Sequence, residues 1–157
     1  MEDLASKIKE RIKGNLALVG IGNPLRGDDG FGPKLIESLK GSVDASLFDC
    51  GTAPENYIIP ILNSNPRTVI LLDAADFGSP PGEVDVFEID SVSNRGFSTH
   101  NMSPRMLADL MKTGASGLNI FLVAVQPKNI AFGEKMSEEV MRGMERLKNI
   151  FVEVCGR

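Results

Sequence analysis

The sequence has no tryptophan, one tyrosine, one histidine and two cysteines among its 157 residues. The two cysteines, Cys50 and Cys155, are too few and too far apart for a disulfide framework or a Cys-x-x-Cys zinc site, so we expect reduced thiols. A structural zinc site with four protein ligands cannot be assembled from one histidine without a cysteine pair. We interpret Cys50 as a small buried apolar side chain rather than a reactive thiol.

Long apolar runs are also missing. The stretch IFLVAV at 120–125 is far shorter than the roughly 18 residues of a membrane helix, so we expect no membrane insertion. The N-terminal segment MEDLASKIKERIKG carries charges throughout and lacks the apolar region of a secretory signal, which predicts a cytoplasmic protein. The net charge of −4 is spread over both halves of the chain, so we do not expect a nucleic-acid partner.

Apolar runs alternate with amphipathic segments along the chain. Strands are predicted at 16–20, 46–49, 68–73, 83–89 and 119–125. Helices are predicted at 2–13, after Pro33, at 54–62, from Pro104 after the cap Ser103, and after the cap Ser137. The link before the strand at 83–89 is too short for a parallel crossover, so this strand is predicted to be antiparallel. The pattern predicts one α/β domain over residues 1–157 with a mostly parallel sheet.

The segment GIGNPLRGDDGFG at 20–32 is a glycine-rich loop between the first strand and the next helix. Such a loop could hold a phosphate, and a nucleotide-binding Rossmann-like domain is therefore one alternative. The glycine spacing of a dinucleotide fingerprint is incomplete, however, and no G-K-[ST] triplet follows. Asp28 and Asp29 would also repel a pyrophosphate, so the loop favours a cation and no nucleotide cofactor is expected.

Polar side chains collect where the predicted strands end. They are Asp28, Asp29, Asp49, Asp73, Asp76, His100 and Gln126. Because the carboxyl ends of parallel strands meet at one edge of a sheet, we expect these groups to be exposed and close together there. Two carboxylates and an imidazole suit a divalent first-row metal with positions left for a substrate, although each aspartate alone equally suits a turn or cap. Thr52, Asn56, Asn101 and Gln126 could hold a substrate backbone or merely complete turns.

Two other catalytic arrangements use the same residues. A Ser-His-Asp hydrolase is less favoured, because the sequence has no G-x-S-x-G elbow and the serines near His100 resemble helix caps. An aspartic dyad, in which adjacent carboxylates share a proton, would leave His100 without a role.

Five motifs in order resemble the nickel-iron hydrogenase maturation endopeptidases. They are GNPLRGDDGFG at 22–32, DCGTAPEN at 49–56, LLDAAD at 71–76, THNMSP at 99–104 and AVQP at 124–127. The sequence is most similar to the branch that processes the large subunit of formate-hydrogenlyase-type hydrogenase 3. The similarity runs from about residue 16 through the closing helix, so the amphipathic helix within residues 1–15 lies outside the family core.

The resemblance implies a three-layer α/β/α sandwich on a twisted five-stranded sheet. It also implies that Asp29, Asp73 and His100 engage Ni²⁺ already installed in the precursor of a hydrogenase large subunit, whose C-terminal extension is then removed. Asp29 stands where relatives often have glutamate, and Cys50 replaces the first of two glycines that many relatives have. We expect the protein to act as a monomer.

The mechanism implied is aspartic-type or nickel-dependent. Nickel held by the precursor and by the three side chains would position the scissile segment. It could also polarise the carbonyl or activate a water, with Asp28 or a second carboxylate as general base. Asp28 could equally cap the helix after Pro33 or orient a ligand. A non-catalytic nickel chaperone is the remaining alternative, and with only three protein ligands we expect the free protein to bind nickel weakly.

Overall fold

The computed structural model describes residues 2–92 and 102–157. In this part of the chain, one sheet has the strand order β2-β1-β3-β5-β4. The strands are β1 (Leu16–Gly20), β2 (Ser46–Asp49), β3 (Thr68–Ala74), β4 (Val84–Glu88) and β5 (Asn119–Val125). β1, β2, β3 and β5 are parallel, whereas β4 runs antiparallel to β5 with Val84 opposite Val125. The mostly parallel sheet with one antiparallel strand is therefore confirmed.

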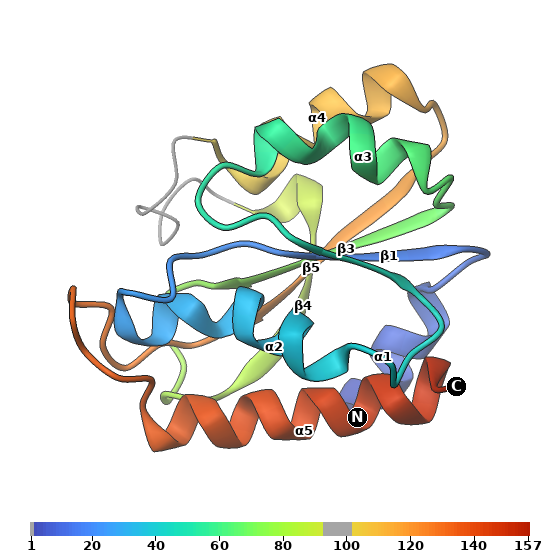
Figure 1. The fold of residues 1–157 in the computed structure, drawn as a ribbon. Helices are drawn as coiled ribbons and strands as arrows, with labels where there is room; N and C mark the ends of the chain where they lie inside the picture. Colours follow the sequence, from blue (N-terminus) through green and yellow to red (C-terminus); the bar gives the residue numbers. More distant parts are fainter. Residues whose placement is uncertain (1, 93–101) are drawn as a thin grey trace.

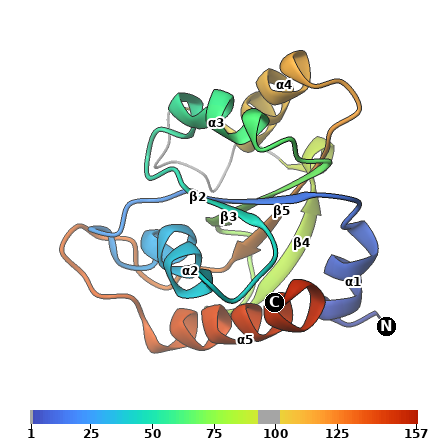
Figure 2. The ribbon, with the colours of Figure 1, turned by 45° about the vertical axis from the view of Figure 1, so that its right-hand side comes forward.

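Helices cover both faces of the sheet (Figures 1 and 2). The helices α1 (Leu4–Arg11), α2 (Phe31–Leu39) and α5 (Glu138–Cys155) lie on one face, and α3 (Ile58–Asn63) and α4 (Pro104–Gly114) lie on the other. The result is the expected three-layer sandwich. None of the helices in the described part of the chain combines the length and the apolar character that crossing a bilayer requires.

The central strands are buried on both faces, which explains their continuous apolar runs. In β1, Leu16 and Leu18 face the helices α1, α2 and α5, whereas Ala17 and Val19 face α3 and α4. All residues of β3 are buried, including its penultimate residue, Asp73. A polar side chain in this position is enclosed by the fold rather than presented to solvent.

The helix boundaries follow local signals. Ser103 Oγ accepts from the Met106 N–H at 3.2 Å, and Ser137 Oγ accepts from the Val140 N–H at 3.3 Å, so both predicted caps are confirmed. The helix predicted at 54–62 is divided into a 3₁₀ turn, η2 (Pro54–Tyr57), and α3. Pro60 lies in the first turn of α3, where a missing N–H costs no helical hydrogen bond.

The N-terminal helix packs on the domain through its apolar side chains. Leu4 and Ile8 are buried against the layer formed with α2 and α5. Arg11 Nε also lies 2.7 Å from Glu88 Oε1 of β4. The helix is shorter than predicted because Ile12, with an extended backbone, ends it.

Candidate active site at the carboxyl edge of the sheet

Asp29 and Asp73 are both buried at the carboxyl edge of the sheet. Asp29 belongs to the 3₁₀ turn η1 (Gly27–Gly30) that follows β1, and Asp73 lies near the end of β3. Their exposed fractions are 2% and 1%. The prediction that these side chains are exposed is therefore wrong, because η1 packs against β3 and β3 is enclosed along its whole length.

Each carboxylate is oriented by a main-chain donor. Asp29 Oδ2 accepts from the Asn23 N–H at 2.8 Å, and Asp73 Oδ1 accepts from the Ala74 N–H at 2.8 Å. These are some of the interactions of the two aspartates, which have further partners. Hydrogen bonds from the main chain restrict the rotation of a carboxylate and so fix the direction in which it can bind.

Neighbouring strands bring the two acids to the same edge. β1 and β3 are hydrogen-bonded neighbours, and beyond their paired residues the Ile21 N–H donates to the Leu72 carbonyl at 2.9 Å. A Cβ at Gly32 would lie 2.5 Å from the same Leu72 carbonyl oxygen. Only glycine allows the start of α2 to approach the end of β3 so closely.

Gly22 has a comparable role within the loop. Its φ of 145° lies outside the range favoured by L-residues, and a Cβ there would overlap the carbonyl oxygen of Asp29. The loop thus folds back on itself, with the backbone of Asp29 directly over Gly22. Glycine at position 22 therefore permits a close approach of two backbone segments that any side chain would prevent.

Asp28 joins segments of the chain that are far apart in the sequence. Its Oδ2 accepts from the N–H groups of Lys128 and Asn129 at 2.8 and 3.1 Å and from Ser137 Oγ at 2.9 Å, while Oδ1 accepts from the Ser137 N–H at 2.7 Å. The side chain is fully buried. Protein donors therefore occupy both oxygens, which favours an anchoring and orienting role over that of a general base. The helix whose N-terminus Asp28 contacts is α5, through Ser137, rather than the helix after Pro33.

Three other polar residues at this edge complete turns. Asp49 is exposed, and its Oδ1 accepts from the Gly51 N–H at 3.1 Å. Gln126 Oε1 accepts from the Phe77 N–H at 2.8 Å, and its Nε2 donates to Asp76 Oδ1 at 3.1 Å. The bond from Gln126 and one from a main-chain N–H lower the pKa of the Asp76 carboxyl. These contacts assign turn roles to the three side chains.

Thr52 and Asn56 are exposed beyond β2, where a substrate can reach them. The adjacent Cys50 is 2% exposed, as predicted for a buried apolar side chain. Burial, with a smaller contribution from the Asp49 carboxylate, raises the pKa of the Cys50 thiol to about 12. A thiol of this kind is protonated at neutral pH and is a poor nucleophile.

His100 and Asn101 lie outside the described residues. Within residues 2–92 and 102–157, His, Cys, Asp and Glu side chains form no group of three or more that could hold a metal. Of the three predicted ligands, Asp29 and Asp73 lie in the described part of the chain, and their role as ligands stays a prediction.

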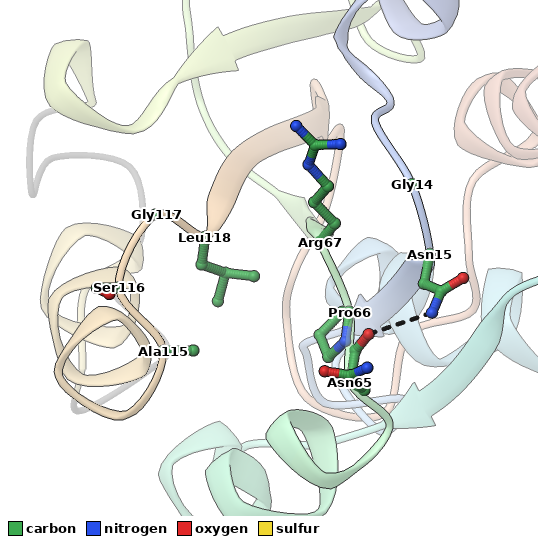
Figure 3. A pocket seen from close by; sticks show the side chains of 9 residues that line it. All are labelled: Gly14, Asn15, Asn65, Pro66, Arg67, Ala115, Ser116, Gly117 and Leu118. Atoms are coloured by element: carbon green, nitrogen blue, oxygen red, sulfur yellow. Dashed lines mark hydrogen bonds between the residues drawn. The ribbon is translucent and has the colours of Figure 1, made fainter.

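A hollow of about 440 Å³ lies at the opposite edge of the sheet (Figure 3). It is lined by Gly14, Asn15, Asn65, Pro66, Arg67, Ala115, Ser116, Gly117 and Leu118. These residues precede β1, β3 and β5, so the hollow lies at the amino ends of the strands. Its lining has one charged side chain, Arg67, and no carboxylate, so it is separate from the acidic site.

Comparison with known proteins gives the family. A family described as hydrogenase maturation protease matches residues 33–154. The hydrogenase 3 maturation protease of Escherichia coli is 30% identical over 131 residues, which cover 82% of this chain and 83% of that protein. The chain belongs to the hydrogenase maturation protease family and is a peptidase, so the resemblance found in its motifs is confirmed.

Solved structures agree with this assignment. The crystal structure of the NiFe hydrogenase maturation protease HycI from Thermococcus kodakarensis has a TM-score of 0.85 and 32% identity, covering 95% of this chain and 98% of that one. The solution structure of the endopeptidase HycI from Escherichia coli has a TM-score of 0.80 and 28% identity, covering 89% of this chain and 90% of that one. The fold is thus shared over nearly the whole chain.

Proposed function

We propose that this peptidase removes the C-terminal extension from the precursor of a nickel-iron hydrogenase large subunit, after recognising nickel held by that precursor. The observation that carries the proposal is the pair of buried carboxylates, Asp29 and Asp73, that adjacent strands bring to one edge of the sheet. The similarity to a hydrogenase 3 maturation protease supports the choice of substrate.

The donor set suits nickel as part of the substrate. Carboxylate oxygens and an imidazole nitrogen are ligands that divalent first-row metals accept, and three protein ligands leave positions for those of the precursor. In this proposal Asp29, Asp73 and His100 contact the metal only when the precursor brings it. Burial of the carboxylates strengthens their attraction for a cation, because little solvent screens the charges.

The carboxylates then act as positioning and proton-transfer groups. The main-chain hydrogen bonds to Asp29 and Asp73 keep both side chains in place, so the scissile peptide is aligned as the metal docks. A carboxylate of this pair takes a proton from the attacking water as the oxygen bonds to the carbonyl carbon. When the C–N bond breaks, the proton passes to the leaving amine. Asp28 contributes by anchoring the loop that carries Asp29.

The test is the intact mass of a precursor large subunit, with and without nickel, after incubation with the protein. Wild type should remove a C-terminal peptide only from the nickel-loaded form. Asp29→Asn and Asp73→Asn keep the shape of the side chain but remove its charge, and should slow processing by about 100-fold or more. His100→Ala should have a similar effect.

Asp49→Asn is the matched control, because Asp49 also ends a parallel strand but is exposed and forms a turn. It should process at the wild-type rate. Thermal unfolding of each variant checks that the fold is retained. Normal processing by Asp73→Asn would refute the site. A submicromolar 1:1 nickel site in the free protein would instead indicate a nickel chaperone.

A further inference from the structure

Two large apolar side chains are exposed on adjoining loops next to the acidic site. Leu25 lies in the loop after β1 and is 62% exposed, and Phe132 lies in the loop between β5 and α5 and is 72% exposed. The Gly133 N–H donates to the Leu25 carbonyl at 2.8 Å, so the two loops meet where these side chains project. In Figure 1 both loops lie at the edge of the sheet where β1 and β5 end.

Further hydrogen bonds hold the two loops together. The Gly27 N–H donates to the Glu134 carbonyl at 3.1 Å, and the Asp28 N–H donates to the Asn129 carbonyl at 2.9 Å. The Asp28 carboxylate adds its bonds to the N–H groups at 128 and 129. The loops therefore present their apolar side chains on a fixed backbone, which reduces the entropy lost when a partner binds.

This surface is continuous with the proposed active site. Leu25 and Asp29 belong to one loop, in which the Asp29 N–H donates to the Arg26 carbonyl at 3.0 Å. A polypeptide lying here would contact the two exposed apolar side chains beside the loop that carries Asp29.

We propose that Leu25 and Phe132 form a docking surface for the precursor large subunit, next to the segment that is cleaved. The inference rests on the proposed function and adds the part of the protein that selects the substrate. The occupant is the precursor, because Leu25 belongs to the loop that carries Asp29 and the loop of Phe132 is hydrogen-bonded to it, so both side chains adjoin the place where the cleaved segment binds. Aromatic side chains are enriched at protein interfaces, and a few large side chains near the centre contribute most of the affinity.

The test is the initial rate of processing as a function of nickel-loaded precursor concentration. Leu25→Ala combined with Phe132→Ala should raise KM by about tenfold, and each single change by less, with kcat nearly unchanged. Val152→Ala is the control, because Val152 is 41% exposed but lies near the far end of α5. It should leave both constants unchanged. All four variants should unfold at the wild-type temperature.

The outcomes distinguish a failure of the docking surface from a failure of the proposed function. If wild type processes the precursor and the double variant has the same KM, the docking surface is refuted. If sedimentation shows that the double change disrupts a dimer of wild type while KM is unaltered, the surface joins copies of this chain instead. If wild type processes no nickel-loaded precursor, the proposed function fails and this docking role fails with it.

Discussion

The carboxylate of Asp28 binds Ser137 twice, with Oδ1 accepting from its N–H at 2.7 Å and Oδ2 accepting from its hydroxyl at 2.9 Å. The two residues are 109 positions apart. Ser137 also caps α5 through its bond from the Val140 N–H. These two hydrogen bonds therefore hold the loop that carries Asp29 to the start of the closing helix.

Asp28→Asn should destabilise the fold. An amide offers one oxygen and places an NH₂ group against donors, so buried N–H groups lose their acceptor at a cost of about 2–3 kcal/mol. Ser137→Ala keeps the main-chain bond and should cost about 1 kcal/mol. Urea unfolding followed by circular dichroism measures both. Equal stability of Asp28→Asn and wild type would contradict the anchoring role.

The contacts of Asp28 are an example of a feature that could not be predicted from the sequence. Strands such as 119–125 and caps such as Ser103 are encoded by neighbouring residues, so their positions were predictable from local patterns. The partners of Asp28 lie about a hundred residues away, and no local pattern relates position 28 to position 137. A general-base role and a structural role for Asp28 were therefore equally compatible with the sequence.

The burial of the strand-end acids was missed for a related reason. Sequence order placed Asp49 and Asp73 in the same way, each at the end of an apolar strand. In the fold, β2 is the edge strand next to β1, whereas β3 is central between β1 and β5. Strand order, which depends on the packing of the whole chain, decides that Asp49 is exposed and Asp73 is enclosed.

Alanine substitutions at two glycines with similar φ angles distinguish the cost of backbone strain from the cost of steric overlap. Gly27 has φ 53° and Gly51 has φ 54°. A Cβ at Gly27 would lie 2.5 Å from the Asn129 carbonyl oxygen, whereas a Cβ at Gly51 would have nothing within 4 Å. Gly51→Ala should cost about 1–2 kcal/mol from backbone strain alone.

Gly27→Ala should lower the free energy of unfolding by the same strain and by about 1–3 kcal/mol more, because the two loops must separate. It should also slow processing, since Asp29 moves with the loop. Chemical unfolding and the precursor assay measure the two effects. Equal stability losses in the two variants would mean that the loops move apart at little cost.

The contact of Gln126 with Asp76 predicts a dependence on pH. Gln126 is 7% exposed and donates to Asp76 Oδ1, while its own oxygen accepts from the N–H groups of Phe77 and Ser79. In Gln126→Glu the acceptor remains, but a second carboxylate faces Asp76. The melting temperature at pH 7 should fall by several degrees.

The loss in Gln126→Glu should diminish as the pH falls towards about 4, because protonation of either carboxyl removes the repulsion. In wild type, the contact of Asp76 has the opposite pH dependence, because its stabilising effect decreases as the pH falls. The pKa of Asp76 is lowered in the folded protein, so its contribution to stability is present above the unfolded pKa and is lost as the pH falls. Melting curves of both proteins between about pH 3 and pH 8 give the comparison, and a pH-independent difference would refute the repulsion.

The raised pKa of Cys50 predicts how the free energy of unfolding changes at alkaline pH. Its thiol has a pKa of about 12 in the folded protein and an ordinary value of 9.0. Because the folded pKa is raised, the stabilising contribution is complete below pH 9 and is lost as the pH rises from there towards 12. Relative to Cys50→Ala, wild type should therefore lose free energy of unfolding above pH 9, by at most about 1.4 kcal/mol per pH unit.

The same thiol should be inert at neutral pH. Iodoacetamide should leave Cys50 unmodified in the native protein and modify it after denaturation, and the treated native protein should process precursor normally. Peptide masses before and after unfolding measure the labelling. Because Cys50 follows Asp49 at the carboxyl edge, rapid native labelling would show that this edge opens to solvent. Loss of processing in Cys50→Ala with the fold retained would give the sulfur a role that its burial does not predict.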